Sequence, residues 1–332
     1  MVNNTQTPFK VPVIDFSGKD LTPGTSDWVS TSNEVRQALE DCGCFEAAYG
    51  KGAVNLFLAY ERSTSPLYSS SFCGTGGRDD AGLNRPWRRG CGGDRRRRES
   101  AKISYSPLRH KDLDHEWPAI GSDLDGEVSG GTAVRRRQEL RILVRVRNLP
   151  ASETIYSYSK QIAELDQMVT RMVFDNFGVE KYHKSHVEAS TYILRVIKYR
   201  DPQSSETNIG CGAHADMSFT TILHQNQVSG LQIKTKDGEW IDVAPSTDSS
   251  FIVMAGYPFT VWSNGKVHAP VHQVVMKGDK TRYSVALFSY GTGVIQPPEE
   301  FIDEEHPLKY KPFDNIQSAV FFTKSKGSLP TQ

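Results

Sequence analysis

Apolar and polar positions alternate with two different periods along this chain, and the period changes near residue 190. From Ile155 to Phe177 apolar residues recur every three or four positions, which predicts a long amphipathic helix that ends at Gly178. After residue 190, short runs of β-branched and aromatic residues are separated by turn residues. We predict strands at 191–199, 220–224, 231–235, 239–243, 251–254, 271–276 and 282–288. With a tight hairpin turn at 236–239 and no helix between them, these strands indicate an antiparallel sandwich or barrel.

The first fifty residues follow a strand, helix, strand pattern. Residues 11–16 form a β-branched run that ends at a Ser-Gly turn, and residues 43–45 indicate a second strand. Between them, Val29 to Glu40 have helical spacing, with Ser32 as the candidate N-cap. The predicted fold class is therefore mainly β with flanking helices.

Residues 51–150 differ from the rest of the chain in composition. They hold 16 Arg and 3 Lys against 12 acidic residues, a net charge of +7, whereas the remaining chain holds 5 Arg and 15 Lys. Three explanations stay open: an arginine-rich arm that binds nucleic acid or phosphate, a disordered insertion, or a stretch translated in a changed reading frame. We favour the changed frame as a hypothesis, because it would exchange Lys for Arg abruptly and remove the apolar pattern.

This contrast divides the chain into four predicted regions. They are an N-terminal segment at 1–50, the atypical segment at 51–150, a helical support at 151–190, and a core with a C-terminal tail at 191–332.

Overall charge and cysteine usage narrow the class of protein. The formal net charge is zero, so the field of the whole protein gives no reason to expect a nucleic-acid or membrane partner. Five cysteines without a paired framework indicate reduced thiols. Residues 1–10 are polar, so we expect no signal peptide, and no apolar run reaches membrane-spanning length. We expect a cytoplasmic protein that acts as a monomer.

Three polar residues in the predicted strand region have the chemistry of metal ligands. In a strand, residues two apart point to the same face, so His214 and Asp216 can present an imidazole and a carboxylate side by side. His272 begins a later strand and is the natural third ligand. Two histidines and one carboxylate on one face of an octahedron leave open positions, an arrangement typical of iron(II) oxygenases.

Other histidines and one cysteine are weaker candidates. A second His-x-Asp match, at His110, lies in the pattern-poor segment and has no strand around it. We place His268 in a loop because it follows an Asn-Gly turn and precedes a proline. His183 and His186 could pair as ligands, but a structural role is the favoured interpretation. Cys211 falls close to the proposed metal and is interpreted as a pocket wall.

A basic residue and a hydroxyl follow the third ligand by ten and twelve positions. Arg282 offers a planar fork that grips a carboxylate through two hydrogen bonds, and Ser284, on the same strand face, adds a hydroxyl donor. Together they suit the distal carboxylate of 2-oxoglutarate, whose keto-acid end would chelate the iron.

Several longer stretches resemble the plant iron(II)/2-oxoglutarate-dependent dioxygenases of the isopenicillin N synthase-like type. The similar stretches are VPVIDF at 11–16, ALEDCGCFEAAY at 38–49, HADMSFTTILHQNQVSGLQI at 214–233, KDGEWIDV at 236–243, VWSNGKVHAPVHQVVMKG at 261–278 and RYSVALFSY at 282–290. PEEFIDEEHPLKYKPF at 298–313 resembles the branch that contains the alkenyl- and hydroxyalkyl-producing enzymes of glucosinolate metabolism and the auxin-oxidising enzymes.

This resemblance implies a fold, a site and a reaction. It implies a double-stranded β-helix (jelly-roll) core with iron(II) held by His214, Asp216 and His272. 2-Oxoglutarate would be held by Arg282 and Ser284, with Tyr199 contributing its hydroxyl. O2 and 2-oxoglutarate would be consumed, with ascorbate as the reductant, to give succinate, carbon dioxide and an oxidised small-molecule substrate.

Three positions depart from the family's usual pattern. Ile197 and Lys198 stand where the family usually has Asn and Tyr, and Gln273 replaces the usual Arg after the iron histidine. The alternative to an active oxygenase is a family member that binds iron but cannot form a full substrate pocket.

Overall fold

A computed structural model describes residues 10–50, 98–106, 141–143, 152–199 and 208–318, apart from 248 and 279. For 98–106, 141–143 and 152–156 it describes the backbone alone. Most of the atypical segment 51–150, including His110, therefore lies outside the described residues, and its origin stays a prediction.

The largest element is a sheet in which all neighbours are antiparallel except the parallel pair β1 and β2. Its strands, in spatial order, are β1 (Val13–Asp15), β2 (Cys44–Ala48), β10 (Ser250–Ala255), β7 (Thr220–Gln225), β12 (Arg282–Gly291), β5 (Ser190–Tyr199), β3 (Arg98–Ser106) and β4 (Arg141–Leu143). The two long strands β5 and β12 pair without interruption and lie within the sheet.

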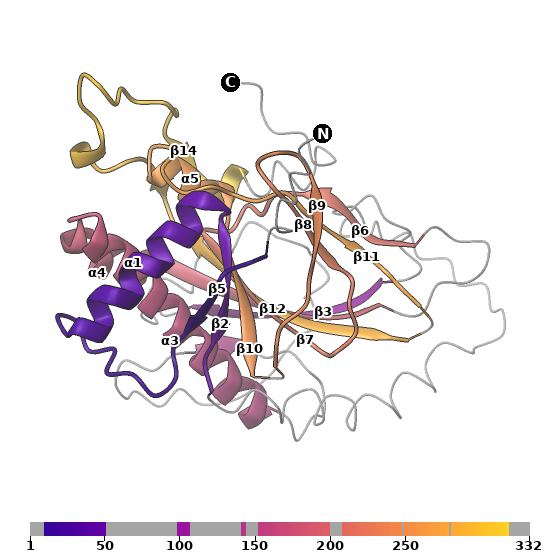
Figure 1. The fold of residues 1–332 in the computed structure, drawn as a ribbon. Helices are drawn as coiled ribbons and strands as arrows, with labels where there is room; N and C mark the ends of the chain where they lie inside the picture. Colours follow the sequence, from indigo (N-terminus) through magenta and orange to yellow (C-terminus); the bar gives the residue numbers. More distant parts are fainter. Residues whose placement is uncertain are drawn as a thin grey trace, which may run out of the picture.

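A smaller sheet covers one face of the large sheet (Figure 1). It consists of β6 (Ile209–His214), β11 (His272–Val275), β8 (Leu231–Lys234) and β9 (Trp240–Val243). Leu231 and Ile233 of this sheet share one buried apolar cluster with Leu223, Ile252 and Ala286 of the large sheet. Two stacked antiparallel sheets of this kind form a jelly roll, so the predicted fold class is confirmed.

Helices cover the other face of the large sheet (Figure 1). They are α1 (Ser26–Asp41), α3 (Ser152–Asn176) and α4 (His183–Ala189), with a 3-10 turn, η2, at Glu180–Tyr182. The apolar stripe of α3, with Leu165, Val169 and Val173, shares a buried cluster with Leu194 and Leu287 of the sheet. The amphipathic pattern of α3 is thus explained by its burial against the sheet.

The remaining elements are short. α5 (Tyr257–Trp262) follows β10, η3 (Glu299–Phe301) is a 3-10 turn, and β13 (Val294–Ile295) pairs with β14 (Phe313–Asp314).

The central strands of the large sheet are consequently buried on both faces. The alternation of side chains along each strand shows which residues face the helices and which face the smaller sheet. On β5, Tyr192, Leu194 and Val196 belong to the cluster beneath the helices. Alternation then turns Ile197 and Tyr199 to the opposite face, toward the smaller sheet, where they contact its residues. We call the face of the large sheet that the helices cover the outer face, and the face that the smaller sheet covers the inner face.

Two sequence predictions about local structure were wrong. Helix α1 begins at Ser26, and its N-cap is Thr25, whose Oγ1 accepts a hydrogen bond from Trp28 N at 3.2 Å. Ser32 lies inside the helix, where its hydroxyl donates to Trp28 O at 2.6 Å. Helix α5 interrupts the series of strands that the sequence analysis expected to be free of helices. Its apolar residues are almost all buried, so its sequence resembles that of a buried strand.

Five strands were not predicted. β13 and β14 have two residues each, too few to form a recognisable strand pattern. β6 contains two glycines and lacks a β-branched run, and β3 and β4 lie in the segment whose pattern predicts little order.

Candidate active site

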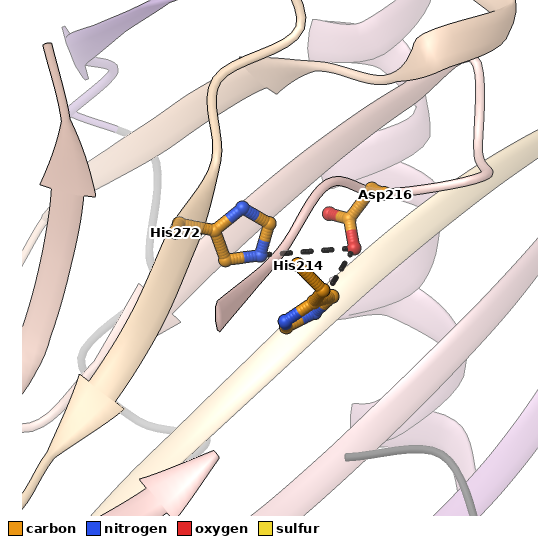
Figure 2. Close-up of side chains that lie close together, drawn as sticks. All are labelled: His214, Asp216 and His272. Atoms are coloured by element: carbon orange, nitrogen blue, oxygen red, sulfur yellow. Dashed lines mark ion pairs between the residues drawn. The ribbon is translucent and has the colours of Figure 1, made fainter. Parts of the chain in front are cut away.

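Two histidines from the smaller sheet and one aspartate bring three ligand atoms together (Figure 2). His214 ends β6 and His272 begins β11, and the two residues are direct partners across this antiparallel pair. Asp216 Oδ1 lies 3.6 Å from His214 Nε2 and 3.7 Å from His272 Nε2. One ligand atom from each residue lies within 4.8 Å of the others. This spacing fits a single metal ion bound between them.

The position of Asp216 has a different cause from the one that strand alternation predicts. Asp216 lies two residues beyond the end of β6, so it does not share a strand face with His214. Its carbonyl oxygen accepts a hydrogen bond from Tyr257 N at 2.8 Å, and its Oδ2 accepts one from Thr221 Oγ1 at 2.5 Å. These two hydrogen bonds turn Oδ1 toward the histidines.

Gly256 allows this arrangement because no larger residue would fit there. A Cβ at this position would lie 1.7 Å from Ser218 O and 3.0 Å from Asp216 O. Such contacts are far inside van der Waals distance, so a side chain would displace the segment that carries the aspartate.

The tautomer of each histidine follows from its backbone contact. His214 Nδ1 lies 2.8 Å from Gly212 O, and His272 Nδ1 lies 3.2 Å from Pro270 O. A carbonyl oxygen accepts hydrogen bonds only, so each Nδ1 carries the proton and donates it. Both Nε2 atoms therefore present a lone pair, and this orienting contact is typical of metal-ligating histidines.

The charges in this group also favour a bound cation. Burial raises the pKa of Asp216, but His272, His214 and the Thr221 hydroxyl outweigh burial and hold that pKa below its usual value. Burial lowers the pKa of His272. The group therefore holds an ionised carboxylate beside a buried neutral imidazole, which is the protonation state that metal binding requires.

A second buried polar group lies on the inner face of β12 and β5. Arg282 is fully buried, and Tyr199 is its direct partner on β5. The guanidinium Cζ lies 5.2 Å from the centre of the Tyr199 ring, and Nη2 donates to Gln225 Oε1 at 2.6 Å. Ser284 lies two residues further along the same face and is also buried.

Three polar atoms of this second group have no hydrogen-bond partner among the described residues. They are Arg282 Nε, Arg282 Nη1 and Ser284 Oγ. Burial lowers the pKa of Arg282, yet arginine stays charged in proteins. A buried charge with open donors is costly unless it is paired, so these donors suit an anionic group such as a carboxylate.

An apolar wall connects the metal ligands with Arg282. Ile197, Tyr199, Cys211, Val274 and Met276 form one buried cluster between the two sheets. Cys211 belongs to this wall, which agrees with the sequence analysis, where it was interpreted as a pocket wall. Its Sγ lies 3.9 Å from His214 Nδ1. Ile197, which replaces the family's usual Asn, contributes to the same wall.

The backbone of Gly230 lies close to the side chain of Arg282. A Cβ at Gly230 would lie 3.1 Å from Arg282 Cδ and 3.2 Å from Val275 O. The glycine thus leaves the room that the arginine side chain occupies.

The remaining candidate residues do not join the triad. His183 Nε2 lies 3.1 Å from Gln167 O, and the His186 ring packs against Phe174 and Phe219. His268 lies in a loop, as predicted. Gln273 Nε2 donates to Gln232 Oε1 at 2.8 Å on the neighbouring strand β8.

Sequence reasoning missed three residues that hold the site together. Thr221, Gln225 and Gly256 each orient a residue that the sequence analysis had singled out. Thr221 and Gln225 look like ordinary strand residues in a single sequence. Gly256, followed by Tyr257-Pro258, is a turn signal whose role only the fold reveals.

The residues fit both groups that the resemblance implies. Two imidazole nitrogens and a carboxylate oxygen are suitable ligands for iron(II) and leave coordination positions open. The open donors of Arg282 and Ser284 fit the far carboxylate of a dicarboxylic keto acid.

Comparison with known proteins agrees with this geometry. Residues 190–290 match the family described as the 2OG-Fe(II) oxygenase superfamily. A protein of Arabidopsis thaliana described as the probable 2-oxoglutarate-dependent dioxygenase AOP1 is 37% identical over 327 residues, which cover 96% of this chain and 98% of that protein.

Two solved structures share the fold. The dioxygenase for auxin oxidation of rice is 19% identical and superposes with a TM-score of 0.67, covering 96% of this chain and 97% of that one. The T7H protein of Neurospora crassa, in complex with alpha-KG and 5-formyluracil, is 22% identical with a TM-score of 0.68, covering 95% of this chain and 96% of that one. Among the described residues, no helix combines the length and the apolar character needed to span a membrane.

Proposed function

The chain belongs to the 2OG-Fe(II) oxygenase superfamily and is an iron(II)- and 2-oxoglutarate-dependent dioxygenase; within it we propose that His214, Asp216 and His272 bind the iron. The observation that carries this assignment is the convergence of Asp216 Oδ1 and the two Nε2 atoms within 4.8 Å. Both Nδ1 atoms donate to backbone carbonyls, so each ring presents its other nitrogen to the metal.

The hydroxyl of Thr221 has a defined role in this proposal. It donates a hydrogen bond to Asp216 Oδ2, so Oδ1 is the oxygen that would hold the metal. One-oxygen binding keeps the protein's share of the coordination shell at three atoms. The remaining positions are then available to the co-substrate and O2.

Arg282, Ser284 and Tyr199 form the other end of the proposed site. The open donors of Arg282 and Ser284 bind the distal carboxylate of 2-oxoglutarate, and Tyr199 adds its hydroxyl at the same end. The apolar wall from Ile197 to Val274 excludes water along the co-substrate between its two ends.

Bound iron(II) supplies the redox chemistry by which O2 and 2-oxoglutarate become succinate and carbon dioxide while a small organic substrate is oxidised. The protein residues orient the co-substrate, exclude water and keep the metal ligands in the required protonation state.

The alternative, a family member that binds iron but cannot form a full pocket, is not favoured. The three ligand atoms are already assembled, and the similarity to AOP1 covers nearly the whole chain.

Succinate formation tests the proposal directly. The purified protein is incubated with iron(II), ascorbate, O2 and 2-oxoglutarate, and succinate is measured with and without candidate substrates. We expect turnover that disappears in His214→Ala. Equal succinate formation in the wild type and in His214→Ala would refute the role of the triad.

We further propose that the protein acts as a monomer in the cytoplasm, with ascorbate as reductant and without a nucleic-acid partner. The three described cysteines are buried and form no disulfide with one another, which supports the choice of a reducing compartment. Light scattering on the purified protein measures its mass, and a dimer would contradict the proposal.

A further inference from the structure

The segment that carries the aspartate of the triad contacts the C-terminal part of the chain. Asp216 follows β6, and the carbonyl oxygen of the next residue, Met217, lies within hydrogen-bond distance of the Asn315 side chain. Asn315 comes directly after β14, and its side chain is fully buried. A buried amide from a distant part of the chain thus lies next to the segment that holds a metal ligand.

The amide of Asn315 satisfies both of its neighbours in one orientation only. In that orientation Nδ2 lies 3.1 Å from Met217 O, and Oδ1 lies 3.3 Å from the backbone N of Gly291, at the end of β12. A carbonyl oxygen accepts hydrogen bonds and a backbone N–H donates them, so Nδ2 donates to Met217 and Oδ1 accepts from Gly291. One side chain thereby joins the ligand segment to the large sheet.

Local hydrogen bonds fix the position of Asn315. Its backbone N–H donates to Gly293 O at 3.3 Å. The preceding residue, Asp314, accepts a hydrogen bond from Gln317 N at 2.8 Å through Oδ1, which caps the turn that carries Asn315. Asp314 also pairs with Val294 in the short β13–β14 ladder. The amide is therefore held in place before it contacts the ligand segment.

An aromatic contact joins the same two segments a second time. Tyr257 begins α5, and its backbone N–H donates to Asp216 O at 2.8 Å. The centre of the Tyr257 ring lies 6.1 Å from that of Phe313 on β14, and β14 lies beside α5 (Figure 1). Both rings pack against the main apolar cluster. The residue whose N–H helps to orient Asp216 is thus itself packed against the C-terminal segment.

We propose that Asn315 is a positioning residue for the iron ligand Asp216, and that Phe313 is a second, weaker one. Asp216 lies beyond the end of β6, so it is not held by the strand ladder that holds His214. The side chain of Asn315 and the backbone of Tyr257 fix the carbonyl groups on this segment instead. This inference rests on the proposed function, because it concerns the iron that the proposed function assigns to Asp216.

A buried asparagine with a purely structural role would affect stability and leave metal binding unchanged. Asn264, which follows α5, is such a residue: its Nδ2 donates to Phe301 O and Pro307 O, and its Oδ1 accepts from Lys309 N. These hydrogen bonds tie the same C-terminal segment to the end of α5, and none of them involves the residues that carry the metal ligands. Asn264 is therefore the matched control for Asn315.

Metal titration of matched variants tests the proposal. Asn315→Ala removes both side-chain hydrogen bonds, and Asn264→Gly removes three while suiting the positive φ of 52° at that position. Iron(II) is titrated by calorimetry into metal-free protein without O2. We expect Asn315→Ala to weaken iron(II) binding about tenfold, because it loosens the support of a metal ligand. Asn264→Gly should bind iron(II) like the wild type, although both variants should unfold at lower urea concentrations.

Two further measurements separate positioning from a general loss of structure. Phe313→Leu keeps apolar volume but removes the ring contact with Tyr257, and should weaken iron(II) binding about threefold. Visible absorption of bound cobalt(II) reports on coordination geometry. At saturating cobalt(II) we expect an altered spectrum in Asn315→Ala and the wild-type spectrum in Asn264→Gly. Wild-type iron(II) affinity in both Asn315→Ala and Phe313→Leu, or equal weakening in Asn264→Gly, would overturn the proposal.

The same titrations distinguish this inference from the proposed function. If the wild type binds iron(II) and His214→Ala does not, the assignment of the triad stands. Equal iron(II) affinity in the wild type and in the C-terminal variants would then refute only the positioning role. If the wild type does not bind iron(II), the proposed function fails as well.

Discussion

The inner and outer faces of the large sheet are both buried, yet their polar groups differ in how completely they are hydrogen-bonded. On the outer face, Asp166 of α3 accepts hydrogen bonds from Tyr192 at 2.8 Å and from Thr220. Thr220 Oγ1 also lies 2.7 Å from Ser289 Oγ. On the inner face, Arg282 and Ser284 keep donors without a partner among the described residues.

This difference separates a structural network from a binding site built on the same strands. Buried polar groups are normally satisfied, so the outer network stabilises the contact between α3 and the sheet. The open donors of the inner face are an exception that a bound anion would remove. Polar residues of similar burial can thus be assigned different roles by whether their hydrogen bonds are complete.

The largest predicted effect is on the outer face. Asp166→Ala removes the buried acceptor of the Tyr192 hydroxyl, while Thr220 keeps its contact with Ser289. The free energy of unfolding should fall by about 3 kcal/mol, since a buried group that loses its partner costs about 1–3 kcal/mol. Urea unfolding at pH 5 measures it. The control, Asp175→Ala, breaks an ion pair on the same helix that is partly exposed, and should lose less than about 1 kcal/mol. Equal losses in the two variants would contradict the structural role of Asp166.

The next prediction concerns pH. Burial raises the pKa of Asp166 from 3.8 to about 6, although Thr220 and Tyr192 oppose the shift. The folded state therefore favours the protonated carboxyl. Its contribution is complete below about pH 4 and is lost as pH rises through about 6, a change of about 3 kcal/mol. Unfolding of the wild type and Asp166→Asn between pH 4 and pH 7 measures it. A constant difference in stability between them across this range would refute the prediction.

Adjacent threonines provide the sharpest comparison of the two faces. Thr221 faces inward and donates to Asp216, whereas Thr220 faces outward and joins the Asp166 network. Thr221→Val should weaken iron(II) affinity about tenfold with little change in stability, because it loosens a metal ligand. Thr220→Val should lower the free energy of unfolding by about 1 kcal/mol and leave iron affinity unchanged. Metal titration and urea unfolding of both variants test this, and an exchange of the two effects would contradict the assignment of faces.

Several features of the fold and site follow from the sequence for physical reasons. The period of apolar residues in α3 predicts a helix with one buried face. The β-rich runs of β5 and β12 predict strands that are buried on both faces. The spacing of Arg282 and Ser284 places them on one face for the same reason.

Other features depend on contacts between residues distant in the sequence. Asp216 is oriented by Tyr257 N, and Arg282 contacts Gln225, which lies 57 residues away in the chain. Local periodicity contains no information on such contacts. α5 was missed because its apolar residues are buried by Phe174 and neighbours from other elements, and no local amphipathic pattern remains.

Replacing Arg282 by methionine tests most directly whether the open donors of the inner face bind 2-oxoglutarate. Unfolding of iron(II)-loaded wild type and Arg282→Met is measured without O2, in the absence of 2-oxoglutarate and at a concentration of about 100 times its Kd for the wild type. We predict that 2-oxoglutarate stabilises the wild type by about 2.7 kcal/mol and the variant hardly at all. Without 2-oxoglutarate, the variant should be at least as stable as the wild type, because it no longer buries an incompletely paired charge. A variant that is strongly destabilised without 2-oxoglutarate, yet is still stabilised by it as much as the wild type, would contradict the account.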